Sequence, residues 1–250
     1  MKLSIIIPTL NESQYLARTI DSVREHAILG EPYEIIVVDS GSNDGTTDIV
    51  RKLKVILVKE DSILTGRATI LNRGASLAKG DVFLFLDADT TPPIGYDEEI
   101  RHTIFDMGAI GGAFEFALEG KGFGLRLVEI INRIRYRISH NYYGDQGIFV
   151  RTEVFRKIGG YPKKRILEAS EFCNSLKSFG RLRLIRKAMK TSPRRFLKGG
   201  VYRVLLNDIK LWFLNLIGQH VDCYADDYWG ENINRSDPMT ICENRSKSGE

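Results

Sequence analysis

The first ninety residues alternate short, continuous apolar runs with segments of helical periodicity, and this alternation limits the folds open to the chain. The apolar runs cover residues 3–7, 35–38, 55–58 and 82–86, and the helical segments cover residues 16–27, 46–53 and 67–78. A continuous apolar run is typical of a strand buried on both faces. Strands separated by helices of this length form right-handed βαβ units, so the pattern predicts an α/β fold with a Rossmann-like, mostly parallel sheet flanked by helices.

The pattern changes after residue 90 without any repeat or low-complexity linker that would divide the chain. Helices are expected over residues 96–107, 124–139, 168–179 and 205–217, and strands over residues 109–118, 148–151 and 183–189. A chain of 250 residues is within the size range of one large domain. We therefore expect one domain over residues 1–220, whose second half completes the sheet, and an acidic tail over residues 221–250.

Cysteine content and hydropathy exclude several classes of protein. The three cysteines, Cys173, Cys223 and Cys242, form no CxxC pair, so a zinc ribbon or a thioredoxin-like motif is excluded and reduced thiols are expected. No window of about 18 residues is free of charge, so no membrane-spanning helix is expected. These features favour a cytoplasmic protein.

Two carboxylates follow the fourth apolar run. Asp87 and Asp89 are two residues apart, and the period of a strand points such side chains to the same side. The carboxyl end of a parallel strand opens into the crevice where α/β sheets bind ligands. Converging carboxylates need a cation, and oxygen ligands favour Mg²⁺ or Mn²⁺, which would hold a diphosphate. The alternative is that the two residues form a turn or cap the next helix.

Polar residues also follow the first and second runs. Asp39 ends the second run and is followed by a turn over residues 40–45, while Thr9, Asn11 and Glu12 follow the first run. These residues share the edge of the sheet that Asp87 occupies. A carboxylate at this edge can accept a hydrogen bond from a base N–H or a ribose hydroxyl, although an ordinary turn is the alternative.

Several well-known motifs are absent from the chain. No GxGxxG follows the first strand, which argues against a dinucleotide cofactor, and no GxxxxGK[ST] phosphate loop occurs. HExxH and GxSxG are also missing, which excludes zincin metalloproteases and serine hydrolases of the nucleophile-elbow type.

Three segments resemble, in order and spacing, the opening signatures of family 2 glycosyltransferases with the GT-A fold, a fold of nucleotide-diphospho-sugar transferases. They are SIIIPTLNE at residues 4–12, IVVDSGSNDG at residues 36–45 and FLDAD at residues 85–89. A bacterial and archaeal subgroup is similar also in GDQGIFVR at residues 144–151 and TSPRRF at residues 191–196. The resemblance covers about residues 2–220 and implies that residues 1–220 form the catalytic domain of a hexosyltransferase.

The resemblance assigns roles to individual residues. It implies donor contacts for Pro8, Thr9, Asn11, Glu12, Asp39, Arg67, Asp87 and Ala88, of which the loop over residues 8–12 and Asp39 hold the base and ribose. Arg67 would lie near the base or the diphosphate. Asp89 would be the direct ligand of Mg²⁺ or Mn²⁺, with Asp87 nearer the ribose. Such enzymes invert the anomeric carbon in one displacement, in which a carboxylate takes the proton of the acceptor hydroxyl.

The chain departs from the family pattern at the expected base. The family places a Glu-Asp pair at the start of a helix in the second half, but here Ala169 follows Glu168. Glu168, Glu171 or Asp145 would then serve as the base, unless the acceptor is already ionised. We prefer Glu168, with Glu171 one helical turn away on the same face. The alternative is that both glutamates are first-turn residues favoured by the helix dipole.

The charge layout raises the question of a membrane. The net charge is only +4, but residues 181–198 contain eight basic side chains and no acidic one, directly before an apolar stretch over residues 201–217. Such a pair suits anionic lipid headgroups, at about 1 kcal/mol per cation. Arg194 and Arg195 would equally suit a diphosphate or a phosphorylated or lipid-linked acceptor, and Gln146 lies in a glycine-flanked loop that faces the acceptor in the family. A solvated basic face is the alternative.

The sequence therefore predicts an inverting, metal-dependent glycosyltransferase that uses a UDP- or GDP-linked sugar donor and an unknown acceptor, at the inner face of a membrane. One rival is a nucleotide-sugar-binding protein that lost its base with Ala169. Another rival is a sugar-phosphate nucleotidyltransferase, but residues 9–12 lack the glycine-rich basic loop of that class. Nucleic acid is not an expected partner because no aromatic platform accompanies the charge.

Overall fold

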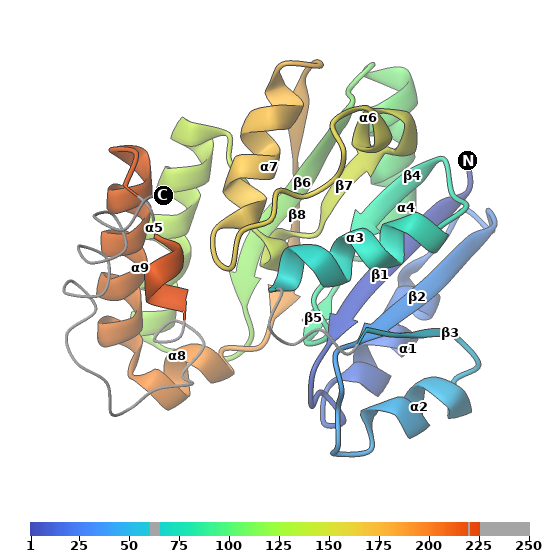
Figure 1. Cartoon of the computed structure of the whole chain (residues 1–250), viewed down its shortest axis with the longest axis horizontal. Coiled ribbons are helices and arrows are strands. Elements are labelled where there is room, and N and C mark those ends of the chain that lie inside the picture. Colours follow the sequence, from blue (N-terminus) through green and yellow to red (C-terminus); the bar gives the residue numbers. More distant parts are fainter. Residues whose placement is uncertain (61–65, 220, 226–250) are drawn as a thin grey trace, which may run out of the picture.

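The computed structural model describes residues 1–60, 66–219 and 221–225, and within them eight strands form one sheet (Figure 1). The strand order is β3-β2-β1-β4-β7-β6-β8-β5. The strands are β1 (Leu3–Thr9), β2 (Tyr33–Asp39), β3 (Ile56–Lys59), β4 (Val82–Phe85), β5 (Thr90–Thr91), β6 (Gly111–Leu118), β7 (Ile148–Arg151) and β8 (Leu182–Thr191).

Helices cover both faces of this sheet. They are α1 (Leu16–His26), α2 (Thr46–Lys52), α3 (Arg67–Leu77), α4 (Tyr96–Arg101), α5 (Phe123–Ser139), α6 (Thr152–Lys157), α7 (Glu168–Lys177), α8 (Arg194–Gly199) and α9 (Val201–Leu216). A π-helical turn, η2 (His102–Asp106), extends α4, and two 3₁₀ turns, η3 (Gly144–Gln146) and η4 (Asp222–Tyr224), lie in the second half.

The predicted Rossmann-like sheet is confirmed, with parallel pairs in its first half and a mixture of parallel and antiparallel pairs in its second. β1 pairs in parallel with β2 and β4, and β2 pairs in parallel with β3, so these four strands end at one edge. In the second half β6 and β8 are parallel, whereas β7 runs antiparallel to β4 and β6. β5, α6 and α8 were not predicted, because each has six residues or fewer and shows no periodicity of its own.

Two hydrophobic clusters, one on each face of the sheet, explain the continuous apolar runs. Ile6 and Phe83 pack with α3, α5 and α7 on one face, and Ile5, Ile7 and Leu84 pack with α1 and α4 on the other. Because side chains alternate between the faces of a strand, a strand covered on both faces must be apolar at every position.

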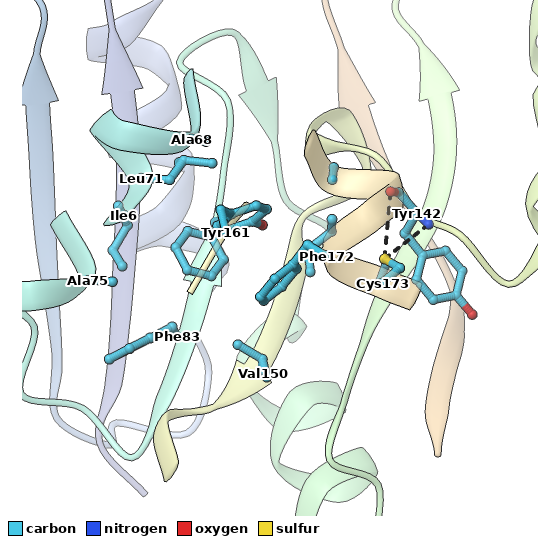
Figure 2. Close-up of a cluster of buried hydrophobic side chains, with 14 of the residues drawn as sticks. Ile6, Ala68, Leu71, Ala75, Phe83, Tyr142, Val150, Tyr161, Phe172 and Cys173 are labelled. Atoms are coloured by element: carbon cyan, nitrogen blue, oxygen red, sulfur yellow. Dashed lines mark hydrogen bonds between the residues drawn. The ribbon is translucent and has the colours of Figure 1, made fainter. Parts of the chain in front are cut away.

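An aromatic group within the first cluster fixes α7 against the carboxyl half of β4 (Figure 2). The rings of Tyr161 and Phe172 stack with centroids 4.0 Å apart, and Phe85 meets Tyr161 edge-on at 5.0 Å. On the far side of α7, the backbone N–H of Tyr142 donates to Cys173 Sγ at 3.4 Å. These contacts hold the first residue of α7, Glu168, beside the end of β4.

Two further findings bear on the predictions about membranes and cysteines. No helix in the described ranges is long and apolar enough to span a bilayer. Cys173 is a buried free thiol, but Cys223 is disulfide-bonded, so the expectation of reduced thiols is wrong for Cys223. Sequence spacing does not reveal which thiols a fold brings together.

The expected boundary at residue 220 and the acidic tail lie largely beyond the described residues. Of the tail, residues 221–225 are described, and Val221, Tyr224 and Ala225 pack against Ile166 and Leu211. Residues 226–250, with Cys242, lie outside the described residues.

The aromatic group predicts a large stability difference between two phenylalanines. Phe172 is fully buried, and replacing it with Ala leaves a cavity, so we expect Phe172→Ala to lower the free energy of unfolding by about 3–5 kcal/mol in urea titrations. Phe179 is 47% exposed just after α7, and Phe179→Ala should cost less than about 1 kcal/mol. Equal losses in the two variants would contradict this packing.

Candidate active site

Asp39 organises the loop that follows β2. Its carboxylate Oδ2 accepts hydrogen bonds from the backbone N–H groups of Gly41 and Ser42, at 3.1 and 3.0 Å, and its Oδ1 accepts one from Thr9 Oγ1 at 3.3 Å. Asp39 is buried, and these bonds fix its orientation while leaving lone pairs on both oxygens.

The loops after β1 and β2 are joined by side chain to backbone hydrogen bonds. Asn11 has a positive φ of 56°, its N–H donates to Ser42 Oγ at 2.8 Å, and its Oδ1 accepts from the Asn43 N–H at 3.0 Å. The N–H of Glu12 donates to Thr46 Oγ1 at 2.8 Å. Pro8 and Thr9 are the last residues of β1. The predicted donor-binding residues at these two strand ends therefore form one rigid rim.

Arg67 lies at the centre of the site. It begins α3, and its guanidinium donates through Nη2 to Asp87 Oδ1, which follows β4, and through Nη1 to Glu168 Oε1 at 3.0 Å. Only 14% of the Arg67 side chain and 7% of the Glu168 side chain are exposed. Charge-assisted bonds from a planar fork are both strong and directional, so Arg67 fixes the positions of both carboxylates.

The η3 turn packs directly on Arg67. A Cβ added to Gly144 would clash with the Arg67 guanidinium, which could move aside only by giving up its bonds to Asp87 and Glu168. Gln146 is fully buried, and its Nε2 donates to the Phe114 carbonyl at 3.0 Å while its Oε1 accepts from the Tyr143 N–H at 3.2 Å. Gln146 therefore anchors the turn to β6, and the turn holds Asp145 near Arg67.

Asp145 is the carboxyl group of the site with the most unusual environment. Its Oδ1 is buried and has no hydrogen-bond partner. Burial, reinforced by the negative charge of Asp87, raises the pKa of Asp145 to about 7, although Arg135, Arg67 and Arg195 oppose the rise. A carboxylate with a free oxygen and a pKa near neutrality is suited to accept a proton.

Asp89, Glu12 and Arg194 form a second charged group. Arg194 Nε lies 2.9 Å from Asp89 Oδ2, and its Nη2 donates to Glu12 Oε1 at 2.5 Å, while the guanidinium lies 4.6 Å from the centre of the Tyr15 ring. Burial, with the charges of Asp87 and Glu12, raises the pKa of Asp89 to about 6 despite Arg194. Glu12 Oε2 is buried without a partner.

This second group fits a divalent cation that is completed by substrate. No cluster of three metal-ligating side chains exists among the described residues. Mg²⁺, however, is commonly held by one or two carboxylates together with substrate phosphates and water. Asp89 and Glu12 share a single guanidinium, and Glu12 Oε2 is buried without a partner, so the group keeps negative charge and a free oxygen that such a cation would take up.

The structure brings most of the predicted site residues together, but Glu171 lies apart from Glu168, and Gln146, expected to face the acceptor, is fully buried. Ala88 is buried, with its carbonyl accepting from Thr19 Oγ1 at 2.7 Å. Glu171 does not join Glu168, because its side chain is 43% exposed and paired with Lys164. Arg195 forms a two-pronged bond to Asp208 of α9, at 2.9 and 2.6 Å.

Sequence reasoning missed the residues that support the site from a distance. Tyr15, under Arg194, gave no signal in the sequence. Thr191, whose Oγ1 lies 3.4 Å from Asp89 Oδ1, belongs to the TSPRRF segment and could have been singled out there. Gly144 likewise belongs to the GDQGIFVR segment, but only the fold shows that Arg67 requires it.

Comparisons with known proteins agree with this geometry. The model of the family described as glycosyl transferase family 2 matches residues 4–157. Glycosyltransferase AglE of Haloferax volcanii is 28% identical over 174 residues, which cover 65% of this chain and 57% of AglE. The undecaprenyl-phosphate 4-deoxy-4-formamido-L-arabinose transferase of Yersinia pestis is 25% identical over 187 residues, which cover 71% of this chain and 54% of that protein. The chain thus spans about half the length of these curated relatives.

A solved structure shares the fold. The mannosyltransferase PcManGT of Pyrobaculum calidifontis, in complex with GDP-Man and Mn²⁺, superposes with a TM-score of 0.61 at 20% identity and covers 96% of this chain and 67% of that one. The predicted GT-A fold is confirmed by this similarity.

The environment of Asp145 predicts a pH-dependent effect of neutralising it. Its pKa is about 7 in the folded protein but about 3.9 in an unfolded chain, so the folded state binds the proton more tightly. The unfolded state therefore gains relative stability as the pH rises from about 4 to about 7, and the loss is complete above pH 7. We expect Asp145→Asn to be more stable than the native chain by about 1–3 kcal/mol at pH 8, with the difference shrinking toward pH 4.

Urea unfolding at pH 5 and pH 8 measures this difference. Asp48→Asn is the matched control, because Asp48 is exposed and its stability effect should not depend on this site. A destabilised Asp145→Asn variant at pH 8 would show that the carboxylate is satisfied rather than strained.

Proposed function

The chain belongs to glycosyl transferase family 2, and on that premise we propose that it transfers a sugar from a nucleotide-diphosphate donor to an acceptor hydroxyl. The observation that carries the proposal is the convergence of Asp39, Asp87 and Asp89 at the carboxyl ends of β2 and β4, on either side of β1. This is the edge at which parallel α/β sheets bind nucleotides.

The rim formed by the loops after β1 and β2 is the proposed site of the nucleoside. Asp39, held by Thr9, Gly41 and Ser42, presents fixed lone pairs to a base N–H or a ribose hydroxyl. Arg67 is bonded to Asp87 just after β4, the strand next to β1, and the ribose and diphosphate would follow there. The proposed donor is a UDP- or GDP-linked sugar, and the GDP-Man bound to PcManGT supports that class.

Asp89, with Asp87 beside it, is proposed to hold Mg²⁺ or Mn²⁺. When bound, such an ion would neutralise charge on the departing diphosphate. Arg194 carries positive charge to the same place, since it contacts both Asp89 and Glu12, and a guanidinium is well suited to phosphate oxygens. The Mn²⁺ in PcManGT supports this assignment.

Asp145 is the proposed base, in place of the preferred Glu168. Glu168 is already bonded to Arg67, and accepting a proton would weaken that buried ion pair. Glu171 faces Lys164 away from the site. In the proposed inversion the acceptor oxygen bonds to the anomeric carbon as the bond from that carbon to the diphosphate oxygen breaks, and the hydroxyl proton passes to Asp145. Glu168 then acts as a positioning residue for Arg67.

One observation favours a second function, that of a nucleotide-sugar-binding protein. Ala169, at the position where the family has its base, is buried and has no group that could accept a proton. Donor binding without turnover, across UDP- and GDP-sugars and a wide set of acceptors, would favour this function over transfer. Sugar transfer by the native chain that is lost when the proposed base Asp145 is replaced would exclude a purely binding function.

Substitution of the two candidate bases separates their roles. We expect Asp145→Asn to lower kcat by about 100-fold or more while donor affinity is kept, because general-base catalysis is lost. The native rate should rise with pH through about 7, as the Asp145 carboxyl ionises. Glu168→Gln should instead weaken donor binding through Arg67, and Glu171→Gln is the exposed control. If Asp145→Asn lowers kcat only slightly while Glu168→Gln lowers it strongly, Glu168 rather than Asp145 would be the base.

The metal assignment predicts a specific loss in Asp89→Asn. Calorimetric titration with UDP and GDP in the presence of Mn²⁺ should show that the Asp89→Asn variant binds the nucleotide about tenfold or more weakly than the native chain. Replacing a residue that only supports a metal ligand already costs about this much, so a direct ligand should cost at least as much. The same titration with EDTA should show little difference from the native chain. Unchanged affinity with Mn²⁺ would contradict the assignment, and Asp48→Asn serves as the control.

A further inference from the structure

Helices α5 and α9 pack against each other at the end of the molecule opposite β3 (Figure 1). Gly124 of α5 allows a close approach, because a Cβ added there would lie 3.1 Å from Val201 Cγ1 and 3.8 Å from Tyr202 Cζ of α9. One side of the pair covers the core, where Leu125 and Val128 of α5 and Leu205 of α9 are buried.

Each helix carries a stripe of large apolar side chains exposed to solvent. On α5 these are Phe123, Ile130, Ile134 and Ile138, with 79, 51, 55 and 74% of the residue exposed. On α9 they are Tyr202, Leu206, Phe213 and Leu216, followed by Ile217, with 54 to 67% exposed. Their spacing of three, four or seven residues places each set on one helical face.

The two stripes adjoin each other. At about 100° per residue, Gly124 and Ile131 lie on the edge of α5 next to its apolar stripe, and Gly124 is where α9 packs. Tyr202, one of the two α9 residues at this contact, itself belongs to the α9 stripe. The helix pair therefore presents one continuous apolar surface, which we call the α5–α9 face. Large contiguous apolar patches are uncommon on monomeric proteins, and they mark contact surfaces.

Positive charge borders the α5–α9 face on both sides. On α5, Arg126, Arg133 and Arg137 lie along the edge remote from α9, with side chains about half exposed although each also pairs with a buried glutamate. On α9, Arg203 and Lys210 lie along the opposite edge and are exposed. The two helices together contain six basic and two acidic residues.

We propose that the α5–α9 face docks on the surface of an anionic phospholipid bilayer. An apolar face bordered by Arg and Lys is the composition of a helix that lies in the membrane interface. The stems of the bordering side chains can lie along the apolar region while their charges reach lipid phosphates.

The surface differs from the one expected from the linear basic stretch over residues 181–198. Most of that stretch forms β8, and its basic side chains lie along a strand of the sheet rather than beside α9. Arg195 is turned to Asp208 and Arg194 to the candidate site. The docking face is therefore built from two helices separated in the sequence by more than sixty residues.

The docked orientation has a consequence that rests on the proposed function. α8 leads from the candidate site to α9. Arg194 at the start of α8 contacts Asp89, and the next residue, Arg195, donates two hydrogen bonds to Asp208 of α9. A chain docked through the α5–α9 face would hold its site beside the bilayer. An acceptor hydroxyl or phosphate on a membrane lipid would then be within reach, a class supported by the undecaprenyl-phosphate transferase among the relatives.

Vesicle sedimentation without donor tests docking separately from activity. The full chain should sediment with vesicles of phosphatidylcholine containing phosphatidylglycerol, less with phosphatidylcholine alone, and less as salt is raised. Ile134→Glu and Leu206→Glu should each lower the partition coefficient at least about tenfold, since a charge replaces an inserted apolar side chain. Ile94→Glu is the matched control, because Ile94 is 65% exposed outside the α5–α9 face.

Unchanged melting temperatures would show that the variants are folded. Arg203→Glu, which keeps the apolar face intact, should lower binding to the vesicles that contain phosphatidylglycerol but not binding to vesicles of phosphatidylcholine. The proposal would be overturned if the native chain fails to sediment with the anionic vesicles. A second copy of the chain, or a further part of it, would then be what covers the face. The proposal would also be overturned if Ile94→Glu lowers binding as much as the two variants on the face. If the native chain sediments with the anionic vesicles but transfers no sugar, the result would count against the proposed function and not against docking.

Discussion

The contact of the Arg67 guanidinium with Asp87 and Glu168 is the interaction on which the geometry of the site depends. It joins the start of α3, the end of β4 and the start of α7, and the η3 turn rests on it through Gly144. Without Arg67, two carboxylates would face each other in a largely buried place. Removing one partner of such a group costs about 3–5 kcal/mol, so the fold and the site share one electrostatic requirement.

The sheet could be predicted because burial on both faces leaves a plain signature in the sequence. Ile5, Ile6 and Ile7 are all fully buried although they alternate between the faces of β1, and no amphipathic strand has that pattern. β5 and α8 were missed because their residues are placed by tertiary contacts: Thr90 pairs with Thr191, and Arg194 is held by two acidic groups. Local preference carries little weight in segments this short.

The candidate site was predictable where a strand end fixes the direction of a side chain, and unpredictable where a helix start does so. Asp39, Asp87 and Asp89 follow strands, and their common edge comes directly from parallel pairing. Glu168 and Glu171 are three apart in α7, yet only Glu168 turns inward, because the aromatic packing of Phe172 sets the rotation of that helix. A linear spacing states which residues share a face but not what that face meets.

The charges of the site also bear on the proposed cation. Burial, together with the negative charges of Asp87 and Glu12, raises the pKa of Asp89 to about 6 even though Arg194 lies 2.9 Å away. A donor diphosphate adds further negative charge at the same place. Arg194 carries one positive charge, and it already directs Nε to Asp89 and Nη2 to Glu12, so it cannot alone balance both carboxylates and a diphosphate. A divalent ion of the kind proposed would supply the remaining positive charge without breaking the contacts that hold α8 to the site.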